Sequence, residues 1–206
     1  MTKKVFIFGE DGFTNITLAS SLSMQGIDVI GETDNENLTL NFVSQHHPDV
    51  TVLNIDFGHI KAINLAVALR KRYPELGIVI TSKTNDIRLL GIDPKDLPIG
   101  VVIVQIAKHR DLDNLKESII SSVDLVSVEA KLSLYEDLSE VQIETFRLMA
   151  EGKANSEIAK LRFVSEKSVE QMLARIAISM GLDFDRKHNQ RVRLTNTYYE
   201  LISGRR

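Results

Sequence analysis

The chain contains no cysteine among its 206 residues. This absence excludes disulfide bonds, thiolate ligands to a metal and cysteine nucleophiles. Long apolar runs are also lacking: the longest, near residues 99–104, is too short to span a bilayer, and the N-terminal run is too short for a signal peptide. We therefore expect a soluble, cytoplasmic protein without a membrane partner.

Enzyme motifs are missing as well. Gly9 and Gly12 flank an acidic pair, but the sequence has no GxxxxGK[ST] loop and no recognisable Ser-His-Asp spacing. His46 and His47 are neighbours at the end of an expected helix, where their side chains diverge and no cysteine is near, so we interpret them as surface residues. The sequence predicts no enzymatic activity, no cofactor and no metal.

Charge is distributed unevenly along the chain. The net charge is −3 overall, but it is −5 in residues 1–129, +2 in residues 130–206 and +5 in residues 186–206. This asymmetry suits an acidic regulatory half joined to a half that approaches phosphates. The alternative interpretation of the last segment is a solvated basic tail.

The first part of the chain alternates between short β-rich runs and helical patterns. Five strands alternating with five helices predict a doubly wound parallel sheet, an α/β fold with helices on both faces and functional groups at the carboxyl ends of its strands. The expected strands are residues 4–8, 28–31, 50–55, 78–81 and 101–106, and the expected helices are residues 13–25, 35–45, 61–73, 85–90 and 111–126.

A second, all-helical pattern occupies residues 138–178. Ser139 with Gln142 fits a capping box at the start of a first helix, while Asn155-Ser156 and Ser165 are polar caps ahead of a second and a third. Residues 162–164 separate the last two helices. This is the spacing of a helix-turn-helix, in which one helix braces another in the DNA major groove.

The same stretch resembles the LuxR-type (NarL-type) DNA-binding domain. The family's glutamate in the first helix appears as Gln142, and the other positions follow without a gap. The matching residues are Leu138, Ser139, Phe146, Leu148, Ala150, Gly152, Asn155, Glu157, Ile158, Ala159, Leu161, Val164, Ser165, Ser168 and Val169.

The resemblance implies a DNA-reading face on the third helix. In the family, residues just after the Thr-Val pair lie against base edges, and Ser168-Val169 match that pair. This places Glu170, Gln171 and Ala174 in the groove. Ser165, Lys167 and Arg175 are better placed to contact phosphates, and Ser168 is also expected among the DNA-binding residues. Glutamate suits cytosine and glutamine suits adenine, although Glu170 also fits a solvated helix residue.

Further helical positions are expected to pack. Met172, Ile176 and Ile178 are predicted to be core residues, and Tyr198 and Tyr199 packing residues. The family usually has a fourth helix that pairs two DNA-binding domains. Here its apolar face is expected at Val192, Leu194, Tyr198 and Leu201.

The first part of the chain resembles the receiver domain of response regulators, which is flavodoxin-like. Receivers have Pro-Asp, an apolar run and then the phosphate-accepting aspartate, whereas this chain has Pro48-Asp49 and then Asn54. An amide cannot form the acyl phosphate, and it brings no charge for Mg²⁺. The acidic pair of receivers matches Gly9-Glu10 without a gap, or Glu10-Asp11 with a shift of one residue, and the hydroxyl is Thr81 or Ser82. The receiver lysine falls near Gln105, with Lys108 three residues on.

Asp56 is an alternative acceptor for a phosphoryl group. It lies two residues beyond Asn54 on the same side of the strand, about 6–7 Å further out, away from a pocket built around residue 54. We prefer a degenerate receiver that does not use aspartyl phosphate. It would serve either as a small-molecule sensor with an unidentified effector or as a dimerisation module.

Together these observations predict an atypical response regulator of the LuxR/NarL type. It would have a receiver domain at residues 1–126, a linker at 127–136 and a four-helix helix-turn-helix domain at 137–206, and would bind double-stranded DNA as a homodimer. Two alternatives are a phosphorylation-dependent regulator that uses Asp56 and a protein-interaction module that has lost DNA binding.

Overall fold

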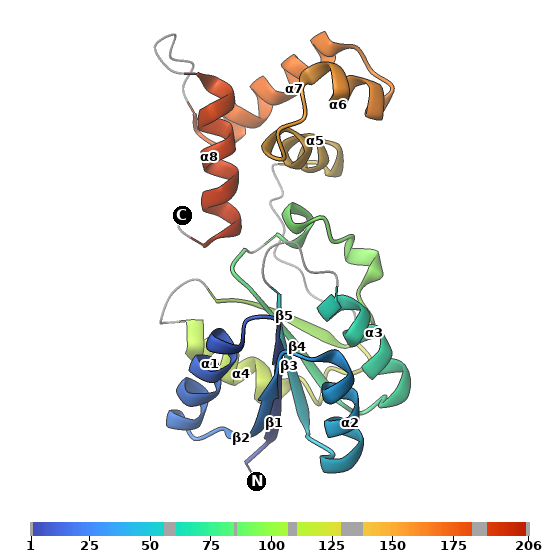
Figure 1. Ribbon diagram of the computed structural model, residues 1–206, viewed down its shortest axis with the longest axis vertical. Coiled ribbons are helices and arrows are strands. Elements are labelled where there is room, and N and C mark those ends of the chain that lie inside the picture. Colours follow the sequence, from blue (N-terminus) through green and yellow to red (C-terminus); the bar gives the residue numbers. More distant parts are fainter. Residues whose placement is uncertain are drawn as a thin grey trace. The chain divides into compact units, whose positions relative to one another are not determined.

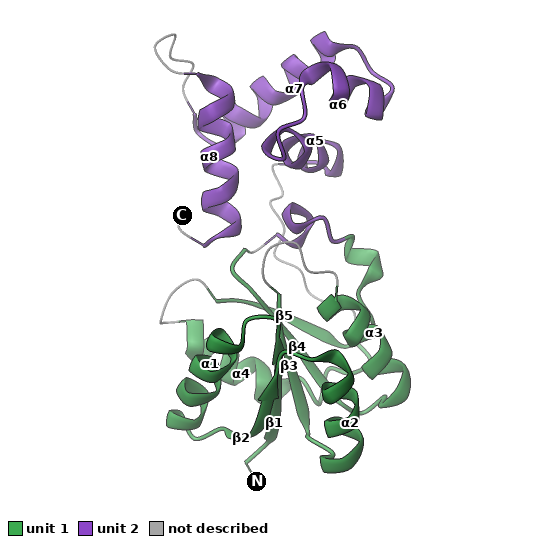
Figure 2. Ribbon diagram, in the orientation of Figure 1, with its two compact units in different colours: residues 1–85, 93–133 green, residues 86–92, 134–206 purple. Residues whose placement is uncertain are grey.

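The computed structural model describes residues 2–55, 61–84, 86–106, 111–128, 138–182 and 189–204. The chain forms two compact units (Figure 2). The first contains residues 1–85 and 93–133, and the second contains residues 86–92 and 134–206. Within the described part of the chain, no helix is long and apolar enough to cross a membrane.

The first unit is built on a five-stranded parallel sheet, as predicted. Its order is β2-β1-β3-β4-β5, and the β4 strand is buried along its whole length, which explains its continuous apolar sequence. The strands are β1 (Lys4–Gly9), β2 (Asp28–Thr33), β3 (Val50–Ile55), β4 (Gly77–Ser82) and β5 (Val101–Gln105). Each lies within about two residues of its expected range.

Helices cover both faces of this sheet, α1 and α4 on one side and α2 and α3 on the other (Figure 1). A core of aliphatic residues fills the layer under α1 and α4, including Val5, Ile7, Leu22 and Leu115. The helices are α1 (Gly12–Met24), α2 (Glu36–His46), α3 (Lys61–Arg72) and α4 (Asp111–Ser121). His47 is the C-cap of α2 in left-handed conformation, so both adjacent histidines lie at a helix end, as expected.

Two helix predictions for this half were wrong. The helix expected at residues 85–90 is a single 3-10 turn, η1 (Ile87–Leu90), which begins at the Asp86 cap and ends at Gly91 with φ +79°. A second short 3-10 turn, η2 (Pro94–Asp96), follows. Asp93 is its N-cap, and Pro94 occupies its first position, where a proline is well tolerated. The helix expected at 111–126 ends at Ser121, and turns follow it.

Four α-helices lie within the described residues of the second unit. They are α5 (Glu140–Ala150), α6 (Asn155–Arg162), α7 (Glu166–Ser179) and α8 (Gln190–Ile202). The predicted capping box is confirmed: the Ser139 hydroxyl accepts from the Gln142 amide, and the Gln142 side chain accepts from the Ser139 amide. The predicted Asn155 cap is wrong, because Ala154 is the N-cap of α6 and the Glu157 carboxylate accepts from its N–H at 2.8 Å.

One apolar cluster holds the second unit together. Phe146 of α5, Leu173 of α7 and Tyr198 of α8 all belong to it, and the Phe146 and Tyr198 rings meet edge to face at 5.2 Å. Leu89, which comes from the segment between β4 and β5, belongs to the same cluster. The domain boundaries predicted from the sequence place this segment in the first domain instead.

Candidate nucleic-acid interface and sheet-edge pocket

The turn between α6 and α7 has the geometry of a helix-turn-helix. Phe163 ends α6 in left-handed conformation at φ +53°, and the Val164 N–H donates to the Ala159 carbonyl at 3.0 Å. Ser165 then caps α7, since its hydroxyl accepts from the Ser168 N–H at 3.1 Å. The chain therefore reverses within a few residues, as the spacing predicted.

Helix α7 has one buried face and one exposed face. Val169, Leu173 and Ile176 are buried, and Met172 packs against the same core. The opposite face contains Lys167, Glu170, Gln171 and Arg175, which are exposed, and Ala174, which is half-buried. The structure thus brings the predicted base-contacting and phosphate-contacting residues onto one side of one helix.

Ile178 corrects the sequence prediction on this helix. It was expected in the core but is 63% exposed, because it lies three residues beyond Arg175 and so continues the outer face. The helical period alone could have placed it there. Its burial was inferred from its apolar character instead.

The predicted reading face is mixed in charge. Lys167 and Arg175 are cationic, while Glu166 and Glu170 stand in the first turns of the same helix. Ser165 and Ser168 have their hydroxyl oxygens 2.8 Å apart, so the two groups already share a hydrogen bond. Lys167 and Arg175 are eight residues, or about two turns, apart and so can meet different phosphates.

Polar contacts also hold α6 against α5. The Arg162 guanidinium pairs with the Glu144 carboxylate and donates to the Val141 carbonyl at 3.2 Å, which ties the end of α6 to α5. Leu161, quoted as a family match, is instead 57% exposed, whereas the Arg162 side chain is only 14% exposed. At this end of α6 the arginine, rather than Leu161, is the more buried side chain.

Arg191 connects three helices of the unit. Its guanidinium donates to the Asn155 side chain at 2.9 Å, at the start of α6, and to the Met149 and Lys153 carbonyls at and beyond the end of α5. Asn155 therefore serves as a tertiary acceptor rather than as the predicted cap. The apolar face predicted for α8 is confirmed at Leu194, Tyr198 and Leu201, whereas Val192 is 55% exposed.

The pocket residues of the first unit lie at the carboxyl ends of β1, β3 and β4. Gly9, Asn54 and Thr81 are register partners, and the Thr81 hydroxyl donates to the Asn54 side-chain oxygen at 2.9 Å. Ser82 is buried, and its hydroxyl accepts from the Thr84 N–H. The side chain of Asn54 is thus hydrogen-bonded to Thr81, a residue that matches the hydroxyl position of receivers.

The two acidic candidates have separate roles. The Glu10 carboxylate lies 3.2 Å from the Lys61 ammonium. Asp11 is the N-cap of α1: it accepts from the Thr14 hydroxyl and the Phe13 N–H, and the Thr14 hydrogen bond holds the pKa of Asp11 below its usual value. Asp11 therefore acts as a helix cap rather than as a pocket acid.

Asn15 is a pocket residue that the sequence analysis missed. It is fully buried and donates to the Gly9 and Thr33 carbonyls at 2.6 and 3.1 Å, while its side-chain oxygen has no hydrogen-bond partner among the described residues. That oxygen lies 2.4 Å from where a Cβ on Gly9 would be, so residue 9 must be glycine. A buried polar group of this kind depends on tertiary contacts and leaves no local sequence signal.

The described pocket residues do not fit the Mg²⁺ and phosphoryl chemistry of receivers. Asn54 is neutral, Glu10 is paired with a lysine and Asp11 is a helix cap, so the negative charge that a hard divalent cation needs is not gathered here. The Gln105 side chain donates to the Lys83 carbonyl at 3.0 Å. Asp56 and Lys108 lie outside the described residues. Among the described residues, no group of acids and histidines is arranged to hold a metal.

Comparison with known proteins gives remote similarities, and no protein-family model matches the chain. It is 24% identical over 169 residues to the DNA-binding transcriptional activator DevR/DosR of Mycobacterium tuberculosis, with 76% of this chain and 78% of that protein covered. It is 23% identical over 188 residues to the response regulator VraR of Staphylococcus aureus, with 85% and 89% covered.

A solved structure of two RcsB dimers bound to two parallel DNAs matches the whole chain at 20% identity. The match covers 98% of this chain and all of the RcsB chain, with a TM-score of 0.55. The fold is a receiver-like α/β unit with a helix-turn-helix unit. At this level of identity the likeness is one of fold.

Proposed function

We propose that the chain is a DNA-binding transcription regulator of the LuxR/NarL response-regulator type. It acts as a homodimer on double-stranded DNA, with a receiver-like domain at residues 1–126, a linker at 127–136 and a DNA-binding domain at 137–206. The remote similarity to regulators named as DNA-binding and to a DNA-bound dimer supports this proposal.

The observation that carries the proposal is the outer face of α7. Its Ser165 cap and its buried face leave Lys167, Gln171 and Arg175 presented together on the outer side of one helix. Glutamine can read adenine bidentately, and the two cations can meet phosphates on either side. A helix of this type in the major groove is the reading element of helix-turn-helix proteins.

We further propose that the regulator works without aspartyl phosphorylation. Asn54 stands at the acceptor position, and its side-chain oxygen already accepts from the Thr81 hydroxyl. The receiver-like unit then supplies either dimerisation or contact with an effector, rather than phosphotransfer.

Random-site selection with the purified protein tests the proposal. We expect an enriched, pseudo-palindromic site whose half-sites are one helical turn apart, with affinity that falls steeply as salt rises. Analytical ultracentrifugation with and without the selected DNA tests the homodimer. If no DNA sequence is enriched and the amount of DNA bound does not depend on salt, the protein-interaction module is favoured instead. The acidic residues Glu166 and Glu170 on the same helix would suit that alternative.

Labelling with acetyl phosphate or beryllofluoride tests phosphorylation independence. We expect no modification and no change in DNA affinity, since the carboxylate is missing at residue 54. The matched control is Asn54→Asp, which restores that carboxylate. Modification at Asp56 accompanied by tighter DNA binding would establish the phosphorylation-dependent alternative.

A further inference from the structure

The second unit includes a segment that the chain supplies from between two strands of the sheet. Residues 86–92 follow β4 and precede β5, yet they pack with residues 134–206 as one unit (Figure 2). Leu89 has no exposed surface and belongs to the same apolar cluster as Phe146 and Tyr198. The core of the helical unit is therefore assembled from two distant pieces of chain.

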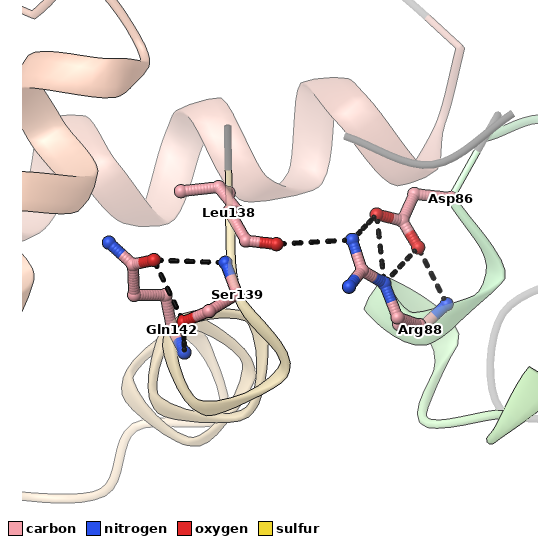
Figure 3. A network of polar contacts seen from close by, with 5 residues as sticks. All are labelled: Asp86, Arg88, Leu138, Ser139 and Gln142. Atoms are coloured by element: carbon pink, nitrogen blue, oxygen red, sulfur yellow. Dashed lines mark hydrogen bonds and ion pairs between the residues drawn. The ribbon is translucent and has the colours of Figure 1, made fainter. Parts of the chain in front are cut away.

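Two hydrogen bonds fasten the segment to the helices. The Arg88 guanidinium donates to the Leu138 carbonyl at 3.3 Å, immediately ahead of the capping box that starts α5 (Figure 3). The Tyr198 hydroxyl of α8 donates to the Leu89 carbonyl. The segment thus touches both α5 and α8, and without it the buried Tyr198 hydroxyl would lose an acceptor.

The segment carries polar partners of its own. The Asp86 carboxylate is fully buried and accepts from the Arg88 N–H at 3.1 Å and from the Arg88 guanidinium at 2.6 to 3.2 Å (Figure 3). Because the arginine lies two residues away, both members of this charge pair belong to the segment and would leave the helices together. A buried carboxylate whose cation stayed behind would resist departure far more strongly.

We propose that residues 86–92 are a detachable part of the core of the DNA-binding unit, which is complete only while they are seated against α5 and α8. The seat is an interaction surface, and its occupant is this segment of the same chain. β4 ends at Ser82, four residues before Asp86, so the segment that packs with the helices is continuous in the chain with the carboxyl end of that strand. The link to DNA rests on the proposed function, whereas the seating does not.

Thiol labelling of the full chain tests detachment, because the natural sequence has no cysteine to interfere. Leu89→Cys places a buried thiol in the segment, and Ala177→Cys places an equally buried one in α7. If the segment opens locally, the Leu89→Cys thiol reacts with maleimide roughly tenfold faster or more than the Ala177→Cys thiol, which reacts only when the unit unfolds. Equal rates would overturn the proposal.

Adjacent tyrosines of α8 provide matched variants. Tyr198→Phe removes the hydrogen bond to Leu89 and keeps the ring, so it should raise the labelling rate of Leu89→Cys about fivefold. Tyr199→Phe removes a hydroxyl that donates to the Ala150 carbonyl instead, so it should leave that rate unchanged. Equal effects of the two variants would contradict a specific seat.

Two further measurements separate the parts of the proposal. Hydrogen exchange in the unsubstituted chain should show the Leu89 and Ile92 amides exchanging faster than the amides in the middle of α7, without any substitution in the core. Adding the selected DNA should slow labelling of Leu89→Cys, because DNA binds the completed unit. Bound DNA that leaves the labelling rate unchanged refutes the link to DNA binding. Absence of DNA binding refutes the proposed function and leaves the detachment test intact.

Discussion

Replacing Lys167 by alanine should weaken DNA binding in a way that salt reveals. Lys167 lies in the first turn of α7, exposed and beside the Ser165 cap, where a phosphate would approach the helix N-terminus. Losing one phosphate contact lowers the slope of log affinity against log salt by about 0.9, hence by about 1.8 for a homodimer. Between about 50 and about 200 mM salt, the variant should lose about twelvefold less affinity than the natural chain.

Fluorescence anisotropy with the selected site, titrated at several salt concentrations, measures this slope. The matched control is Lys71→Ala on α3, which removes the same charge from an exposed position in the other unit. An unchanged slope for Lys167→Ala, or an equal change in both variants, would refute the assignment of α7 as the DNA-reading helix. Affinity should fall by a similar factor on sites that differ at single base pairs, since phosphate contacts carry no base information.

Three other outcomes follow from the structure. Gln171→Ala should relax base preference at one position per half-site by about 1–3 kcal/mol, measured by competition among single-base variants of the site. Arg191→Met should lower the free energy of unfolding by about 2 kcal/mol in urea titration, and Asn155→Ala should be non-additive with it because the two side chains share a hydrogen bond. Burial raises the pKa of Tyr198 above its ordinary value of 10.0, so its contribution to stability is complete below pH 10 and declines as pH rises further; Tyr198→Phe should flatten this alkaline loss in thermal melts.

Most of the framework could be predicted from local signals. The five strands and the first three helices of the second unit follow from apolar runs and their period, and polar caps mark the starts of α5 and α7. The fourth helix was expected from the family resemblance. The failures involve residues whose role is set by distant partners. Asn155 accepts from Arg191, 36 residues away, and Leu89 packs in a core otherwise drawn from residues beyond 134.

The candidate sites divide in the same way. The outer face of α7 could be predicted from helical spacing together with the family resemblance, and Ile178 was misplaced only because its apolar character was given more weight than its position. Asn15, by contrast, is defined by carbonyls of β1 and β2 that fold over it, so no spacing in the sequence indicates it.

The seat of Leu89 also has a consequence for how the protein is made. Tyr198, whose hydroxyl donates to the Leu89 carbonyl, lies 109 residues later in the chain. A ribosome delivers the N-terminal part first, so residues 86–92 emerge and wait, with an unpartnered leucine, until nearly the whole chain has been synthesised. Joining residues 137–206 to a different receiver would leave that place in the core vacant. The DNA-binding half of this chain is therefore not a portable module.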